Sequence, residues 1–258
     1  MQSYPEIPVE NQKLAACLHR PALSENVDVP IVICCHGLTG TRVGTAYRLV
    51  ELARRLERES IACLRFDFRG CGESDGRFED LTTQTLFDDL RAVFEWVSRT
   101  RGIDATRVGI LGSSFGAYTA ARGARFMDGL RCLVFLAPVA NPHALTRQDM
   151  TEAGWTFLRK NGWIEHNGQR LGAQFFDTYP GDDVPVLLAQ SAAPLLIFHG
   201  QGDKSVPIVH GRDYESAMQK AGRVVELRTL DTHDHGMRNI AATDTILAGA
   251  VEWFRRHL

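Results

Sequence analysis

Six short apolar runs constrain the fold of this chain more than any other feature of its sequence. Each run is nearly continuous in apolar residues and is bounded by Gly, Pro or Asp, which is typical of strands buried on both faces of a parallel sheet. The runs are Val29–Cys35, Ile61–Phe66, Arg107–Leu111, Cys132–Leu136, Pro194–His199 and Val224–Leu230. One further short strand is expected earlier in the chain, around Lys13–His19.

Segments with helical periodicity separate these runs. Their apolar residues recur every three or four positions, with charged residues on the opposite face. These segments are Ala46–Glu59, Leu81–Arg99, Ala117–Phe126 and Ile240–Leu258. Strands that alternate with helices indicate βαβ units. The sequence therefore predicts an α/β fold in a single domain spanning residues 1–258, with a mostly parallel central sheet flanked by helices on both faces.

Residues 138–193 interrupt this alternation, because they are too many for a plain connection between two strands. The segment is rich in aromatic side chains, which linkers lack. These aromatics are Trp155, Phe157, Trp163, Phe175, Phe176 and Tyr179. We therefore expect an inserted cap over approximately 138–193, whose aromatics either wall a substrate pocket or form a core of their own.

Composition excludes several classes of protein. The formal net charge of -2 gives no indication of nucleic acid or an anionic membrane as a partner. The N-terminal residues show no basic region followed by an apolar run, so we expect no signal peptide, and no apolar stretch is long enough to span a bilayer. The six cysteines form no C-x-x-C pair, which disfavours a metal site or a dithiol and favours buried free thiols. We expect a cytoplasmic protein, and the sequence leaves a homodimer open as its assembly state.

A candidate nucleophile follows the strand expected at Arg107–Leu111. The strand runs directly into Gly112-Ser-Ser-Phe-Gly116, which opens the next helix. A serine at such a turn is held exposed in a tight backbone conformation, and its flanking residues must be small so that strand and helix can approach each other. The alternative is a glycine-rich turn with incidental serines. The glycine frame centres on Ser114, so we assign Ser114 rather than Ser113 as the nucleophile.

A serine hydroxyl needs a base and an orienting acid, which follow such a serine in the order acid, then histidine. Asp203 lies where the strand expected at Pro194–His199 ends, and His233 and His235 lie beyond the end of the next strand. We prefer His235, because it directly precedes the turn into the last helix. Asp231 and Asp234 are weaker acid candidates, since both share the loop of the histidines.

The oxyanion of an acyl-transfer reaction needs two hydrogen-bond donors. We expect the backbone N–H of Phe115, which follows the nucleophile, and that of Leu38 in the early loop His36-Gly-Leu-Thr-Gly40. The alternative for this loop is a phosphate-binding turn, but neither G-x-G-x-x-G nor G-K-[ST] is present. No metal or cofactor is expected.

Taken together, these motifs resemble the α/β-hydrolase superfamily along nearly the whole chain. The matching residues are His36-Gly37, Asp67–Ser74, Gly112–Gly116, His199–Asp203 with Val206-Pro207, and Asp234-His235. The chain looks closest to compact carboxylesterases of the cinnamoyl and feruloyl esterase type. The resemblance implies an α/β-hydrolase fold and cofactor-free hydrolysis of esters of small or aromatic acids. The chain departs from the family pattern at Met237, where such enzymes often carry an aromatic residue.

The mechanism expected from these residues is a two-step acyl transfer through an acyl-enzyme on Ser114, with a small-molecule ester as the substrate. A thioesterase, a C–C bond hydrolase or a small peptidase would use the same three residues, because cap and pocket select the leaving group. The non-enzymatic alternative is a binding protein that has kept the fold. A dehalogenase or an epoxide hydrolase is excluded, because each needs a carboxylate at the position of Ser114.

Overall fold

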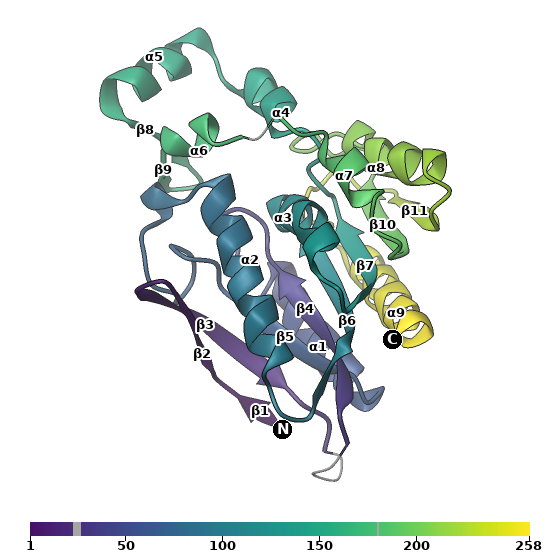
Figure 1. Ribbon diagram of the computed structural model, residues 1–258. Coiled ribbons are helices and arrows are strands. Elements are labelled where there is room, and N and C mark those ends of the chain that lie inside the picture. The colour runs from purple at the N-terminus through teal and green to yellow at the C-terminus, as the bar shows by residue number, and fades with distance from the viewer. Residues whose placement is uncertain (23–26, 180) are drawn as a thin grey trace.

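The centre of the molecule is a mostly parallel sheet of nine strands (Figure 1). The computed structural model describes residues 1–22, 27–179 and 181–258. The strands of this sheet are β1 (Gln2–Ser3), β2 (Glu6–Val9), β3 (Gln12–His19), β4 (Val29–Cys35), β5 (Ala62–Phe66), β6 (Ile103–Ser113), β7 (Leu130–Leu136), β10 (Leu195–Gly200) and β11 (Val225–Leu230). Their order across the sheet is β1-β3-β5-β4-β6-β7-β10-β11, and β2 pairs with β3.

The N-terminal strands are antiparallel to their neighbours, and all the later ones are parallel. Strand β3 runs antiparallel to β1, β2 and β5, whereas β5, β4, β6, β7, β10 and β11 pair in parallel. Strands β4, β5 and β10 are buried along their whole length, as their continuous apolar sequence predicted.

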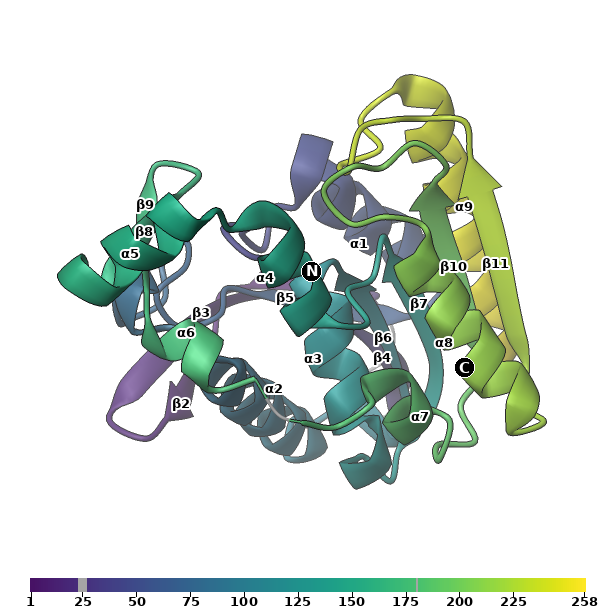
Figure 2. The ribbon, with the colours of Figure 1, turned by 90° about the horizontal axis from the view of Figure 1, so that it is seen from above.

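Helices cover both faces of the sheet. The helices are α1 (Arg48–Arg58), α2 (Thr83–Ser98), α3 (Phe115–Gly123), α4 (Pro142–Asp149), α5 (Glu152–Asn161), α6 (Gln174–Asp177), α7 (Val184–Leu188), α8 (Val209–Lys220) and α9 (Ile240–His257), with short 3₁₀ turns η1 (Thr45–Tyr47), η2 (Phe78–Asp80) and η3 (Ala124–Phe126). Side chains of α1 and α9 pack in one apolar cluster, and those of α2, α3, α7 and α8 in another. Figure 2 shows α8 and α9 on opposite sides of β10 and β11. The predicted fold class is confirmed.

The sequence pattern misplaced the start of one helix. The helix expected from Ala46 begins at Arg48, because Ala46 and Tyr47 have φ values of 51° and 57°. Positive φ is uncommon for residues other than glycine, and nothing local in the sequence indicates it here. The pattern also gave no sign of the short edge strands β1 and β2.

Residues 137–194, here named the β7–β10 segment, carry α4–α7 and the hairpin of β8 (Trp163–His166) and β9 (Gln169–Gly172). The hairpin turns through Asn167-Gly168, which both have positive φ, as a two-residue turn of this type requires. In Figure 2, α4–α6 and this hairpin lie to one side of β10 and β11. No helix within the described residues is long and apolar enough to cross a membrane.

All six cysteines are buried and free, as the sequence predicted. The closest approach that the structure records between two of them joins the Sγ atoms of Cys34 and Cys63 at 3.6 Å, too far apart for a disulfide bond. These thiols pack as small apolar groups in the strands.

Candidate active site

Ser114 lies in the tight turn between β6 and α3. Its backbone has φ 53° and ψ −118°, outside the helical and extended regions that L-residues favour. Such conformations cost about 1–3 kcal/mol and persist where the surrounding structure enforces them, commonly at functional sites. Hydrogen bonds enforce this one: the Ser114 N–H donates to Leu136 O at 2.9 Å, and Ser114 O accepts from Ala117 and Val139.

The two flanking glycines are required by close backbone approach. A Cβ at Gly112 would lie 2.5 Å from the Cα of Ala117, at the start of α3. A Cβ at Gly116 would lie 2.7 Å from the carbonyl carbon of Cys35, at the end of β4. Both distances are far below the usual 3.5–4.0 Å between carbon atoms, so only glycine allows strand and helix to pack this closely.

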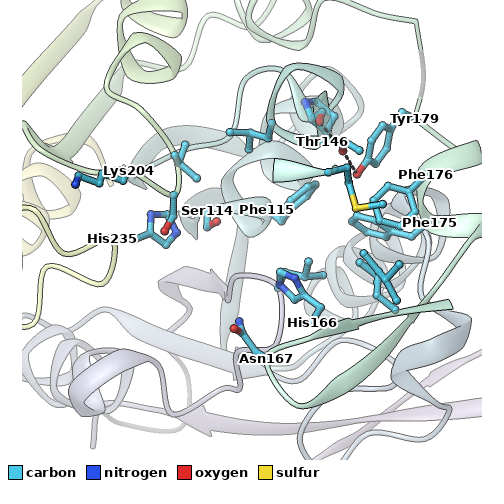
Figure 3. A pocket seen from close by; sticks show the side chains of 18 residues that line it. Ser114, Phe115, Thr146, His166, Asn167, Phe175, Phe176, Tyr179, Lys204 and His235 are labelled. Carbon is cyan, nitrogen blue, oxygen red and sulfur yellow. Dashed lines mark hydrogen bonds between the residues drawn. The ribbon is translucent and has the colours of Figure 1, made fainter. Parts of the chain in front are cut away.

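His235 and Asp203 form a hydrogen-bonded pair beside Ser114. Asp203 follows β10, and His235 lies in the loop between β11 and α9. The Nδ1 atom of His235 lies 2.7 Å from Oδ2 of Asp203. Ser114 and His235 line the same pocket, and Figure 3 shows the imidazole next to the Ser114 side chain. The structure thus brings the three predicted residues to one place.

The Asp203 carboxylate is buried and well supplied with donors. Its Oδ1 atom accepts hydrogen bonds at 3.0 Å from the N–H groups of Ser205 and Val206. Burial alone would raise the pKa of Asp203, but the hydrogen bond and charge of His235 and the N–H of Val206 outweigh it and lower the pKa. The group is therefore a stable anion beside His235, suited to orient the imidazole and stabilise its cation.

The alternative residues of the same loop lie elsewhere. His233 does not line the pocket; its ring packs where a Cβ on Gly202 would stand. Asp234 is paired with Arg238 at 2.7 Å, and this hydrogen bond lowers the pKa of Asp234 to about 2. Asp231 is exposed. Of the acids and histidines weighed from the sequence, Asp203 and His235 are the pair that the structure brings together.

The two residues predicted to supply the oxyanion donors both lie at the pocket. Leu38 and Phe115 both line the pocket of Ser114. Within residues 1–22, 27–179 and 181–258, neither N–H donates a hydrogen bond to another residue. At the first position of α3, the Phe115 N–H has no acceptor within the helix and is available to a ligand.

A buried histidine fixes the loop that carries Leu38. The Nε2 atom of His36 accepts from the N–H of Phe68 at 3.0 Å, so the proton of the neutral ring lies on Nδ1, which donates to Gly37 O at 2.8 Å. Burial lowers the pKa of His36, in agreement with a neutral ring. The sequence matched His36 to the family pattern but gave it no role.

Ion pairs of Asp67 and Arg69 fix the turn formed by residues 67–74. Asp67, which is fully buried, accepts from the guanidinium of Arg42. Arg69 donates through Nε to the buried Asp89 at 2.5 Å and through Nη1 to Glu10 at 2.9 Å. These contacts fit a structural role for the stretch in shaping the turn, which the resemblance implied.

The pocket in front of Ser114 has a volume of about 430 Å³, in the range usual for small-molecule sites. Most of its lining is apolar or aromatic, and much of it comes from the β7–β10 segment (Figure 3). The lining from this segment is Pro142, Leu145, Thr146, Met150, Ile164, His166, Asn167, Leu171, Phe175, Phe176 and Tyr179. Phe175 packs edge-on against Phe115, Phe176 and Tyr179, with ring centroids 5.3–5.7 Å apart.

A hydroxyl pair supplies one polar feature of this wall. The Thr146 hydroxyl donates to Pro142 O at 3.0 Å, so it must accept from the Tyr179 hydroxyl, 3.2 Å away. The Tyr179 oxygen therefore keeps lone pairs for a further donor. Burial raises the pKa of Tyr179 to about 12, and the phenol stays protonated at neutral pH. Sequence spacing could not reveal this pair.

Two further buried side chains support the loops of Asp203 and His235. His199 donates through Nε2 to Val206 O at 2.8 Å, beside Asp203. Arg48 donates through Nη2 to the carbonyls of Gly236 and Met237 at 2.8 and 2.7 Å, directly after His235. His199 belongs to the motif that ends in Asp203, whereas nothing in the sequence pointed to Arg48. Among the described residues, no group of three His, Cys, Asp or Glu side chains is arranged to hold a metal.

Comparison of the sequence with known proteins finds a matching family and several relatives. Residues 52–258 match the sequence model of the prolyl oligopeptidase family. An Escherichia coli protein described as an uncharacterized 31.7 kDa protein in the traX-finO intergenic region is 30% identical, and the alignment covers 90% of this chain and 93% of that protein. The quorum-quenching protein AidA of Acinetobacter baumannii is 34% identical over 45% of this chain and 39% of its own length.

Solved structures share the fold over the full chain. Est1E of Butyrivibrio proteoclasticus, solved with ferulic acid bound, superposes with a TM-score of 0.79 at 22% identity and covers 96% of this chain and 98% of its own. The α/β-hydrolase GrgF from Penicillium superposes with a TM-score of 0.76 at 16% identity, over 100% of this chain and 99% of its own. At these identities the likeness is one of fold, and it agrees with the predicted α/β-hydrolase fold.

Proposed function

The chain belongs to the prolyl oligopeptidase family and is a serine hydrolase of the α/β-hydrolase class, and on that premise we propose that it is a carboxylesterase acting on esters of small or aromatic acids. The observation that carries the proposal is the composition of the pocket at Ser114. Its volume of about 430 Å³ suits a small acyl group, and its aromatic lining favours an apolar or aromatic one.

In the proposed acylation step, the Ser114 oxygen attacks the carbonyl carbon of the ester while Nε2 of His235 takes the hydroxyl proton. The 2.7 Å hydrogen bond to Asp203 keeps the proton of the neutral ring on Nδ1, so that Nε2 is free to act as the base. The carbonyl oxygen becomes an anion, which the N–H groups of Leu38 and Phe115 stabilise. When the C–O bond breaks, the cationic His235 returns its proton to the departing alcohol.

Deacylation repeats these roles with water as the nucleophile. His235 takes a proton from the water, whose oxygen attacks the acyl carbon, and the same two N–H groups stabilise the second oxyanion. Collapse releases the acid and returns the proton to Ser114. The lowered pKa of Asp203 favours its anionic form throughout, which supports the imidazolium in both steps.

The Tyr179 oxygen supports one refinement of the acyl group. Because its proton is directed to Thr146, it is an acceptor toward the pocket, and it would bind an acyl group whose far end carries a hydroxyl. Among aromatic acids, hydroxylated ones are therefore expected to bind better than their unsubstituted analogues.

The test is a panel of esters assayed with the wild type and with Ser114→Ala. We expect hydrolysis of p-nitrophenyl acetate and of methyl 4-hydroxycinnamate, with kcat lower by several orders of magnitude in Ser114→Ala and an unchanged circular dichroism spectrum. Ser113→Ala is the matched control and should retain activity. Retained activity in Ser114→Ala, or no turnover of any ester by the wild type, would refute the proposal.

The family match favours one second candidate, a small peptidase, because the family takes its name from an oligopeptidase. The same residues would then release an amine instead of an alcohol, with His235 protonating the nitrogen. Rates on N-acetyl-alanine p-nitroanilide and on p-nitrophenyl acetate separate the two. A higher kcat/KM on the anilide would replace the esterase assignment with the peptidase.

A further inference from the structure

His210 joins the start of the β7–β10 segment to the core of the molecule. It is the second residue of α8, and it is only 4% exposed. Its Nδ1 atom accepts hydrogen bonds from the backbone N–H groups of Ala140 at 3.2 Å and Asn141 at 3.3 Å. Within residues 1–22, 27–179 and 181–258, these two N–H groups donate to no other acceptor. One imidazole nitrogen therefore serves both donors.

The two hydrogen bonds fix the tautomer of this ring. An imidazole nitrogen accepts a hydrogen bond only when it carries no proton, so the proton of the neutral His210 ring lies on Nε2. Burial, with the charge of His199, lowers the pKa of His210 to about 4, in agreement with a neutral ring at pH 7. A side chain without an acceptor at this point would leave the N–H of the buried Ala140 unpaired, which is costly.

Helix α4 begins directly after these two N–H groups. Asn141 caps the helix, because its Oδ1 atom accepts from the N–H of Ala144 at 3.0 Å. From α4, Leu145 and Thr146 line the pocket of the candidate active site, and Thr146 is hydrogen-bonded to the Tyr179 hydroxyl (Figure 3). The position of α4 therefore sets the width of the pocket on this side and the place of the hydroxyl pair.

Ser114 is held in place without His210. The N–H of Ser114 is bonded to β7, and its carbonyl oxygen accepts from N–H groups of α3. Val139 is fixed by bonds of its own: its N–H donates to Ser114 O at 3.3 Å, and its carbonyl oxygen accepts from the Tyr214 hydroxyl at 2.9 Å. Loss of the acceptor at His210 should thus loosen the chain from Ala140 onward and leave the nucleophile where it is.

From these contacts we propose that His210 is a positioning residue for the acyl side of the pocket. Through its Nδ1 atom it fixes the start of α4, and through α4 it places the wall that contacts the acyl group. It does not line the pocket itself. His210 thereby determines the selectivity for large, hydroxylated acyl groups over acetate. The placement of α4 stands on the hydrogen bonds alone, whereas the selectivity rests on the proposed function.

Two variants of similar size test where the acceptor must lie. The amide oxygen of His210→Asn can take the place of Nδ1, whereas that of His210→Gln lies near the place of Nε2. We expect hydrogen–deuterium exchange of the amides in residues 139–146 to be about tenfold faster in His210→Gln than in the wild type, and unchanged in His210→Asn. Arg212→Gln, at an exposed position of α8, should also match the wild type.

The selectivity is measured on methyl 4-hydroxycinnamate and p-nitrophenyl acetate. In His210→Gln, KM for the cinnamate should rise about tenfold, while kcat on the acetate stays within about twofold of the wild type. His210→Asn should show wild-type values on both esters. A residue that served only the stability of the fold would change both esters alike in His210→Gln, and that result would overturn the role in selectivity.

The wild type alone provides a further test, which decides the question even if His210→Gln does not fold. In nitrogen-15 NMR spectra of histidine-labelled protein at pH 7, His210 should be the tautomer protonated on Nε2. A proton on Nδ1, or equal exchange of residues 139–146 in His210→Asn and His210→Gln, would overturn the placement of α4 by His210. If the wild type hydrolysed no ester, the proposed function would fail, and the NMR and exchange results would still decide this placement.

Discussion

A single methyl group at Gly116 should impair catalysis without touching a catalytic side chain. The Cβ of an alanine there would lie 2.7 Å from the carbonyl carbon of Cys35, and closer still to the carbonyl oxygens of Cys35 and His36. Carbon atoms normally stay 3.5–4.0 Å apart. Because the obstructing atoms belong to the backbone, no rotamer change relieves the overlap, and α3 must move away from the end of β4 by about 1 Å.

This displacement predicts a matched loss of rate and stability. It moves Ser114 and the Phe115 N–H relative to Leu38, and a misplacement of about 1 Å costs about 10²-fold in rate. Overpacking of this kind costs about 1–3 kcal/mol. For a chain of this size each kcal/mol lowers Tm by about 2–4 °C, so a loss of about 2–12 °C is expected.

The assay compares Gly116→Ala with Gly123→Ala on the same helix. A Cβ at Gly123 meets the flexible Cε of Met127 at 3.1 Å, which can move, and alanine favours the helix by about 1 kcal/mol. Thermal unfolding and kcat on p-nitrophenyl acetate should therefore be near wild type in this control. The reasoning is wrong if Gly116→Ala keeps wild-type kcat and Tm, or if both variants lose them equally.

Three further predictions follow from the site and its surroundings. Asp203→Asn should lower kcat by about 10⁴-fold with an unchanged fold, because the amide would donate to His235 Nδ1 and impose the wrong tautomer; a loss below tenfold in steady-state kinetics would contradict this. Phe176→Ala should raise KM about tenfold for cinnamate esters and leave acetate esters unaffected, and an equal effect on both would argue against an aromatic acyl site. The free energy of unfolding should fall as the pH drops from about 6.5 toward 4, because burial, with the charge of His199, lowers the pKa of His210 to about 4. In this pH range the unfolded chain takes up a proton that the folded chain does not, and His19, whose pKa is also lowered, contributes with the same sign. His210→Asn should therefore reduce the pH dependence of the free energy of unfolding, measured by urea titration. An unchanged pH dependence in this variant would contradict the lowered pKa of His210.

The sheet and the candidate catalytic residues could be predicted because their signals are local. Strand β4 spans Val29–Cys35, the range expected from its apolar run, since a strand buried on both faces leaves no polar position inside it. The residues around Ser114 and Asp203 carry their own turn signals at the ends of strands. Chain order, together with the position beyond the end of the next strand, then limited the choice of histidine to His233 or His235.

The remaining features depend on contacts between residues far apart in the chain. Thr146 and Tyr179 are separated by 33 positions, and Arg48 and Gly236 by 188. No spacing rule connects such pairs, because the packing of whole elements brings them together. The left-handed backbone of Ala46 and Tyr47 was equally hidden, since neither residue favours it and only the surrounding structure imposes it.

The candidate catalytic residues and the aromatic wall of the pocket lie on different parts of the chain, and this has a consequence for how substrate specificity can evolve. Ser114, Asp203 and His235 lie on loops at the ends of core strands, whereas most of the aromatic wall lies on the β7–β10 segment. Mutations can therefore change this wall while the candidate catalytic residues stay in place. Proteins that descend from one ancestor would then diverge in substrate specificity before they diverge in reaction type. Tolerance to mutation should be highest in residues 137–194 and lowest at the strand ends.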